Sequence, residues 1–133
     1  AELLAVDVVS PNQSEAEAIT GVVVASIADA LRAAAILHER GAKQIVLKLG
    51  EQGAVASDAM GSIVHIPAPQ VAVVDTTAAG DTFVGGFAAA LAAGSSEDEA
   101  IRFGQVAAAL SVTRAGAQPS IPTLSDVQAF KAP

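Results

Sequence analysis

The chain has 133 residues, a net charge of −7 and 52% hydrophobic residues, enough apolar content for the core of one compact domain. The acidic balance argues against nucleic-acid binding, which needs a basic surface, and no uncharged apolar run reaches the roughly 18–20 residues of a membrane span. The absence of cysteine excludes disulfides, thiolate metal sites and a cysteine nucleophile, and it favours a cytoplasmic protein.

Apolar, β-branched segments alternate with helical patterns along the chain. The predicted strands lie at residues 3–9, 44–49, 54–57, 62–66 and 71–74. The predicted helices follow capping residues or glycine turns and lie at residues 14–20, 27–40, 79–93 and 97–113, with a short last helix after Thr123 or Ser125. This alternation predicts an α/β fold, a layered sandwich whose mainly parallel sheet is flanked by helices, within one domain over residues 1–133.

The segment V-D-T-T-A-A-G-D-T-F-V-G-G-F, residues 74–87, lies where a predicted strand ends and a helix begins. Ligands of open α/β sheets bind at such junctions. Ala78, Ala79 and Gly80 are small, so their backbone N–H groups can surround an anion at the positive end of the helix. Asp81, beside them, could accept the proton of an attacking hydroxyl. The segment therefore suits phosphoryl transfer.

The same residues also have plain structural interpretations. Asp81 lies where an aspartate commonly caps a helix, and Asp75 could cap a loop. His65 is expected to be a strand residue that faces solvent or a loop. Neither the P-loop pattern nor the dinucleotide glycine pattern occurs. The residues alone leave both interpretations of Asp81 open.

Four segments in order resemble the ribokinase family of sugar kinases. They are S-P-N-Q-S-E-A-E, K-L-G-E-Q-G, V-D-T-T-A-A-G-D-T-F-V-G-G and residues 100–122, and the resemblance covers essentially the whole chain. The family usually reads D-T-x-G-A-G-D, and the A-A-G-D variant here favours members that act on ribose. The resemblance implies a ribokinase-like, Rossmann-like sandwich of which this chain is the C-terminal, nucleotide-binding part.

The resemblance also implies site roles. Asp81 would be the catalytic base, and the backbone of Ala78, Ala79 and Gly80 would form the anion hole. Asn12 and Glu15 would position Mg²⁺, water and the phosphates of ATP, with Glu15 acting partly through water. The other nucleotide-binding positions would be Lys48, Gly50, Glu51, Gln52, Gly53 and Gln105. The family often has Thr or Ser at position 48 and His or Asn at position 105, which weakens those two assignments.

A potassium ion beside the anion hole is a further implication of the resemblance. Its ligands would come mostly from backbone carbonyls of six residues: Asp75, Thr77, Ser111, Arg114, Gly116 and Ser120. Asp75 differs from the others because its carboxylate would help to neutralise the ion. The first aspartate of the motif would thus hold a cation, while the second acts as a base.

The expected function is ATP-dependent phosphorylation of a sugar primary hydroxyl, with D-ribose as the expected sugar and ribose 5-phosphate as the product. One alternative is a family member that acts on fructose, a nucleoside or a modified sugar, and another is a non-catalytic nucleotide-binding module. The family's sugar-binding residues lie mostly in an N-terminal half not seen here. We therefore expect a fragment that is inactive by itself, and a homodimer for the whole protein.

Overall fold

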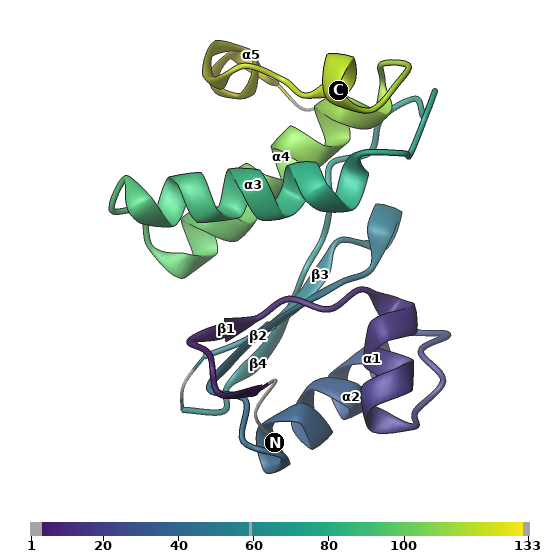
Figure 1. The fold of residues 1–133 in the computed structure, drawn as a ribbon, viewed down its shortest axis with the longest axis vertical. Coiled ribbons are helices and arrows are strands. Elements are labelled where there is room, and N and C mark those ends of the chain that lie inside the picture. The colour runs from purple at the N-terminus through teal and green to yellow at the C-terminus, as the bar shows by residue number, and fades with distance from the viewer. Residues whose placement is uncertain (1–3, 59, 132–133) are drawn as a thin grey trace. The chain divides into compact units, whose positions relative to one another are not determined.

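The computed structural model describes residues 4–58 and 60–131, and the chain divides into two compact units, Ala1–Pro67 and Ala68–Pro133 (Figure 1). Each unit is described by itself below. The organisation of residues 1–133 as one domain stays a prediction.

The first unit contains a four-stranded sheet in the order β1 (Val8–Val9), β2 (Gln44–Lys48), β3 (Ala54–Ser57) and β4 (Ile63–Ile66). The β1–β2 pair is parallel, whereas β2–β3 and β3–β4 are antiparallel. The prediction of a mainly parallel sheet is therefore wrong for the described strands, which form a mixed sheet. The reason is the length of the connections between strands. Short turns join β2 to β3 and β3 to β4, whereas parallel pairing needs a crossover of a dozen or more residues.

Two predicted strands differ from the structure. The strand expected at residues 3–9 is reduced to β1, and Leu3 lies outside the described residues. Residues 71–74 form no strand. The N–H groups of Val74 and Asp75 instead donate to the carbonyl of Val112, at 2.7 and 3.1 Å. A carbonyl at the end of a helix thus accepts hydrogen bonds from N–H groups that were expected to pair with a neighbouring strand.

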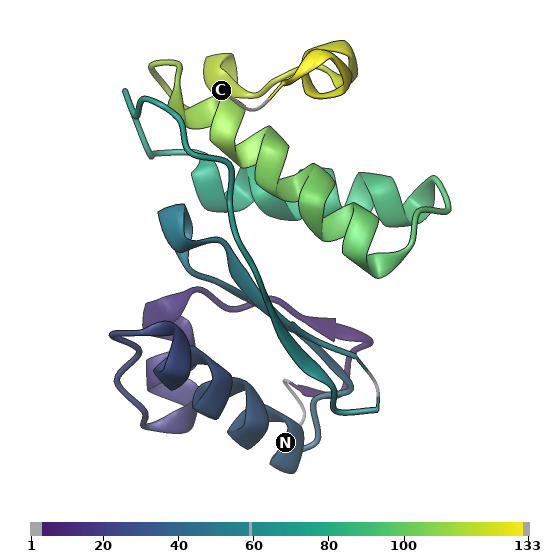
Figure 2. The ribbon, with the colours of Figure 1, turned by 180° about the vertical axis from the view of Figure 1, so that it is seen from behind.

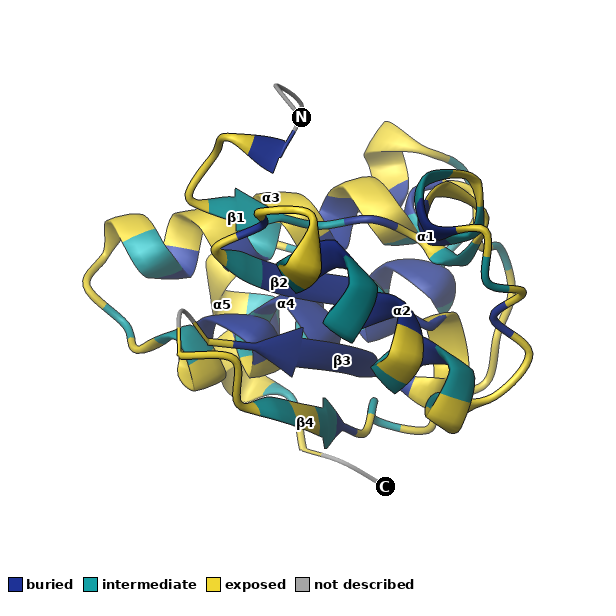
Figure 3. Ribbon diagram, turned by 90° about the horizontal axis from the view of Figure 1, so that it is seen from below, coloured by how far each residue is buried: buried dark blue, intermediate teal, exposed yellow. Residues whose placement is uncertain are grey.

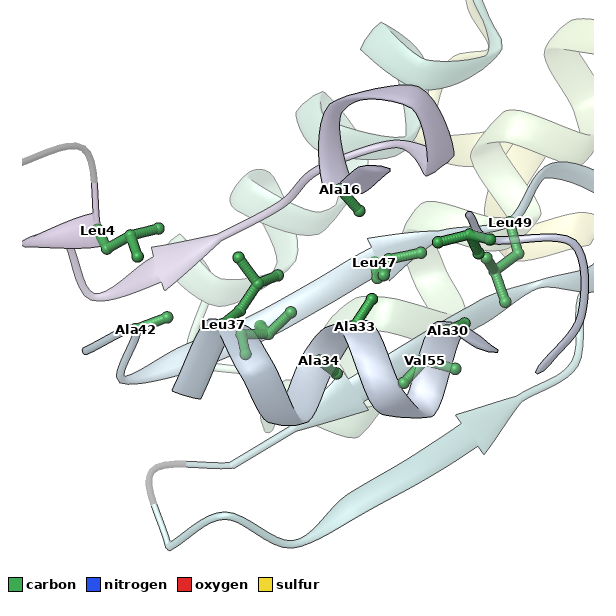
Figure 4. Close-up of a cluster of buried hydrophobic side chains, with 12 residues drawn as sticks. Leu4, Ala16, Ala30, Ala33, Ala34, Leu37, Ala42, Leu47, Leu49 and Val55 are labelled. Atoms are coloured by element: carbon green, nitrogen blue, oxygen red, sulfur yellow. The ribbon is translucent and has the colours of Figure 1, made fainter. Parts of the chain in front are cut away.

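Helices α1 (Gln13–Thr20) and α2 (Ile27–Glu39) pack with the sheet around one apolar cluster. Leu37 of α2, Leu47 of β2 and Val55 of β3 are fully buried in it (Figure 4). Ile45 of β2 is fully buried in the same cluster. Figure 3 shows β3 buried along its whole length, whereas β4 is partly exposed. Ile45 and Leu47 are two residues apart, so both point to the same face of β2.

The second unit contains α3 (Ala79–Ala92), α4 (Glu97–Val112), the 3₁₀ turn η3 (Gln118–Ser120) and α5 (Leu124–Ala129). Figure 2 shows α3 and α4 side by side. They approach closely at two glycines. A Cβ on Gly104 would lie 2.8 Å from the carbonyl oxygen of Phe83, and one on Gly86 would lie 3.2 Å from Cβ of Ala107. Larger residues at these positions would force the helices apart.

Among the helices of the described residues, none combines the length and the apolar character that crossing a membrane requires.

Candidate functional site

Helix α3 begins without a side-chain cap. Its N-cap residue is Ala78, which offers no side-chain acceptor, and its backbone has φ −102° and ψ 6°. The N–H of Ala79 donates to the carbonyl of Thr76 at 3.2 Å, in a turn that leads into the helix. The N–H groups of Gly80 and Asp81 lie in the first turn, where an α-helix provides no acceptor. This helix start can therefore receive an anion from outside the chain.

Gly80 is exposed, and its own surroundings do not require glycine. A Cβ built at this position would meet no heavy atom within 4 Å, and its φ is not positive. The predicted anion hole thus has open space directly over its backbone. A ligand that approaches the Gly80 peptide closely would explain the absence of a side chain there.

Asp81 occupies the third helical position of α3 and is exposed. Within the described part of the chain, its carboxylate makes no hydrogen bond or ion pair. The capping interpretation of Asp81 is therefore wrong for this structure, because no side-chain cap closes α3. Its carboxylate is available to accept a proton at the edge of the helix start.

Asp75 is, in contrast, held by three hydrogen bonds. Its Oδ1 accepts from the Thr77 hydroxyl at 2.5 Å and from the Thr77 N–H at 2.9 Å, and its Oδ2 accepts from the Gly116 N–H at 2.9 Å. The Thr77 hydroxyl, followed by the N–H groups of Gly116 and Thr77, lowers the pKa of Asp75 below its ordinary value. The carboxylate is thus ionised at neutral pH and joins two loops that are distant in sequence.

The segment after α4 contains the other predicted cation ligands. Ser111 and Ser120 are buried, and their hydroxyls donate to the carbonyls of Ala108 and Ala117 at 3.0 and 2.6 Å. The Arg114 side chain pairs with Asp126 of α5 at 3.3 Å. These side chains make contacts within the unit, in keeping with the prediction that a cation would be bound mostly by backbone carbonyls. Hydrogen bonds join Asp75, Thr77 and Gly116 directly.

In the first unit, Asn12 and Glu15 form a capping box at the start of α1. Oδ1 of Asn12 accepts the Glu15 N–H, and Oε2 of Glu15 accepts the Asn12 N–H, both at 2.8 Å. The N-x-x-E motif therefore has a local structural role in this unit. Both residues are exposed, and Asn12 lies beside Lys48 through a parallel bridge.

The predicted nucleotide-binding turn follows β2 as the 3₁₀ turn η2 (Gly50–Gln52). Gly50 and Gly53 have φ values of 59° and 94°, which favour glycine. The Leu49 N–H donates to the Gly53 carbonyl at 2.8 Å, and the Gly53 N–H donates to the Gly50 carbonyl at 3.0 Å. Because Lys48 also bridges to Asn12, the start of α1 and this turn are neighbours in the first unit.

Gln105 belongs to the second unit, where it is buried on α4 with 5% of its surface exposed. Glu51 lies in η2 and is exposed. The sequence analysis missed a contact in the first unit: Nε2 of His65 lies 2.6 Å from the Gln52 carbonyl oxygen. No sequence signal could have revealed it, because the acceptor is a main-chain group.

Comparison with known proteins gives the class of the chain. Residues 1–124 match the description "pfkB family carbohydrate kinase", and the chain belongs to this family. Its fold is ribokinase-like, with a mixed four-stranded sheet flanked by helices. The resemblance stated from the four sequence segments is thereby confirmed.

Three similar proteins illustrate the range of the family. A ribokinase of Haemophilus influenzae is 48% identical over 97% of this chain and 42% of its own length. The structure of Arabidopsis thaliana ribokinase in complex with ribose and ATP is 36% identical, with a TM-score of 0.88 over 97% of this chain and 43% of that one. The structure of phosphofructokinase-2 of Escherichia coli in complex with potassium is 30% identical, with a TM-score of 0.80 over 92% of this chain and 39% of that one. The chain thus spans about two fifths of the length of these relatives.

Proposed function

We propose that the protein containing this chain is an ATP-dependent sugar kinase that converts D-ribose to ribose 5-phosphate. The carrying observation is the start of α3, which has no side-chain cap and which places the Asp81 carboxylate, without a partner among the described residues, beside open backbone at Gly80. Family membership and the ribokinase relatives support this assignment.

In this proposal, Asp81 accepts the proton of the sugar's primary hydroxyl while the hydroxyl oxygen attacks the γ-phosphorus of ATP. The bond between the γ-phosphorus and the β–γ bridging oxygen breaks, and ADP leaves. The N–H groups at residues 78–80 and the positive end of α3 stabilise the negative charge of the transferring group. The N–H of Ala79 already donates to Thr76, so Gly80 contributes most directly.

Asn12 and Glu15 fit a role in holding Mg²⁺ largely through water. When bound, Mg²⁺ would neutralise charge on the ATP phosphates. Both side chains already bond each other's backbone, and the described residues contain no cluster of three or more acidic or histidine side chains that would form a direct cage. The Asn12 N–H holds the Glu15 carboxylate in place, and Asn12 is itself bridged to Lys48.

We assign the potassium site to the backbone of Asp75, Thr77, Ser111, Arg114, Gly116 and Ser120, with the Asp75 carboxylate as the compensating charge. The hydrogen bonds from Thr77 and Gly116 to Asp75 support this assignment, since they bring two of the loops together. The potassium complex of the Escherichia coli relative is in keeping with it.

In the first unit, the nucleotide would contact Lys48, Gly50, Glu51, Gln52 and Gly53. In the second unit, Gln105 is the proposed adenine contact. The left-handed glycines of the turn allow a ligand to approach the backbone closely. The homodimer and the cytoplasmic location stay predictions.

A kinase for another sugar is the second candidate, because a relative in this family is a phosphofructokinase. The deciding experiment is a coupled assay of ADP formation by the full-length protein with ATP, Mg²⁺, K⁺ and a panel of D-ribose, 2-deoxyribose, fructose 6-phosphate and a nucleoside. We expect the highest kcat/KM with D-ribose. Preference for another member of the panel would overturn the sugar assignment, and nucleotide binding without sugar-dependent ADP formation would favour a non-catalytic module.

A further inference from the structure

His65 of β4 reaches the predicted nucleotide-binding turn. Its Nε2 lies 2.6 Å from the carbonyl oxygen of Gln52, 13 residues earlier in the chain. A carbonyl oxygen only accepts hydrogen bonds, so Nε2 must carry the proton and donate it. The ring therefore links an ordered strand to the middle of a short glycine turn.

The strand holds His65 in a defined place. His65 pairs directly with Val55 across the β3–β4 ladder, so the two side chains lie on the same face of the sheet. Val55 is fully buried in the apolar cluster of the first unit, which anchors this part of the ladder. The imidazole is thus presented to the turn from a rigid element.

Hydrogen bonds hold the turn in its observed conformation. Gly50 and Gly53 bound it, and glycine samples more backbone conformations than any other residue. The Gln52 carbonyl and the Gly53 N–H belong to one planar peptide unit. A bond that holds the carbonyl therefore also fixes the direction of the Gly53 N–H, which donates to the Gly50 carbonyl at 3.0 Å.

We propose that His65 is a positioning residue for the nucleotide: its Nε2–H holds the Gln52–Gly53 peptide so that the turn is already in its ligand-binding conformation. This inference rests on the proposed function, in which residues 50–53 line the nucleotide. Preorganisation of this kind increases affinity because the ordering cost is met before the ligand binds. His65 touches neither reacting atom in this scheme, so it acts only through the turn.

The test compares two single-residue variants of the full-length protein. His65→Phe keeps a ring but removes the donor, whereas His65→Gln keeps an N–H donor on a long side chain. Isothermal titration calorimetry measures the Kd for Mg–ADP. Loss of one neutral hydrogen bond predicts a roughly fivefold higher Kd for His65→Phe, partial or full recovery in His65→Gln, and an unchanged kcat at saturating ATP and sugar.

His38 provides a matched control in the same unit. Its Nε2 also makes a 2.6 Å hydrogen bond, but to the buried hydroxyl of Ser57 rather than to the turn. His38→Phe should lower the Tm, because it leaves that hydroxyl without its partner, and it should leave the Kd for Mg–ADP unchanged.

Two results would overturn the inference while leaving the proposed function intact. One is a wild-type Kd in His65→Phe, and the other is a loss of affinity that follows the loss of Tm equally in the His65 and His38 variants. Failure of the wild-type protein to bind Mg–ADP would overturn the proposed function together with the inference.

Discussion

The starts of α1 and α3 carry an acidic residue at the same helical position, yet they use it differently. In α1, Glu15 and Asn12 bond each other's backbone, and the N-cap has the extended ψ of 179°. In α3, Ala78 has a ψ of 6° and no polar side chain, and Asp81 bonds neither the backbone nor another side chain among the described residues. One helix start is closed by the chain itself, and the other is left open.

The other helices show which arrangement is the ordinary one. Ser96 and Glu99 close α4 in a capping box, as Thr123 and Asp126 close α5, and both N-caps have ψ near 160°. Among the described α-helices, each except α3 thus has a side-chain cap at its start. Natural proteins omit such local stabilisation mainly where function requires it. The open start of α3 therefore supports the proposed role of Asp81 more strongly than the motif alone does.

Asp81→Asn tests the open start of α3 most directly and should have the largest effect. Loss of a general base costs about 10²–10⁴-fold in rate, and kcat of the full-length protein should fall by that amount. The Tm should stay near the wild-type value because the Asp81 carboxylate makes no hydrogen bond or ion pair with the residues that the structure describes. Steady-state kinetics and a thermal melt measure the two quantities.

Asp98→Asn is the matched control for this experiment. Asp98 is an exposed aspartate in the first turn of α4, so its substitution removes the same charge from a neighbouring helix. Its kcat should match the wild type. A wild-type kcat in Asp81→Asn would remove the base assignment, and equal losses in both variants would point to a general charge effect.

Asp75→Asn should have an intermediate effect that depends on potassium and pH. The hydrogen bonds to Asp75 lower its pKa, so the folded state holds the ionised form more strongly than the unfolded state does. The stabilisation from ionised Asp75 is fully present above the ordinary aspartate pKa. It is lost as the pH falls through the lower pKa that Asp75 has in the folded state. Asp75→Asn should therefore lower the Tm at neutral pH and flatten its decline between about pH 5 and pH 3.

The same substitution should raise the potassium concentration needed for half-maximal activity, since it removes the compensating charge. Glu99→Gln is the control, because Glu99 also has a lowered pKa, caused mainly by the Ser96 N–H, but caps α4 instead of joining the loops at Asp75. It should shift the pH dependence of the Tm and leave the potassium dependence unchanged. A potassium requirement that is unaltered in Asp75→Asn would end the cation assignment.

The sequence predicted the helices well because their signals are local. The helix predicted at residues 97–113 is α4, Glu97–Val112, and the capping box of Ser96 and Glu99 marks its start. Residues 71–74 were predicted wrongly as a strand, because a strand exists only with a partner, and here the Val112 carbonyl takes that place. The capping box of Asn12 and Glu15 follows from their spacing, whereas the contact of His65 with a main-chain carbonyl leaves no trace in the sequence.

Ser96→Ala and Ala78→Ser should have the smallest effects and test why α3 is open. Ser96→Ala removes the cap of α4 and should cost about 1 kcal/mol of unfolding free energy. Ala78→Ser adds a hydroxyl to α3, but with ψ at 6° that hydroxyl lies outside the extended geometry in which the other N-caps accept a bond. We therefore expect Ala78→Ser to raise the unfolding free energy by much less than Ser96→Ala lowers it. Urea denaturation measures both changes.

Ser95→Ala is the control for this pair, because Ser95 precedes the cap and its side chain does not close α4. It should change the unfolding free energy by much less than Ser96→Ala. If Ala78→Ser instead gained as much as Ser96→Ala loses, the backbone at residue 78 would convert readily to the extended form. The open start of α3 would then follow from the missing hydroxyl alone. A gain near zero would mean that the turn from Thr76 to Ala79 sets the backbone and keeps the N–H groups of Gly80 and Asp81 available whatever residue stands at position 78.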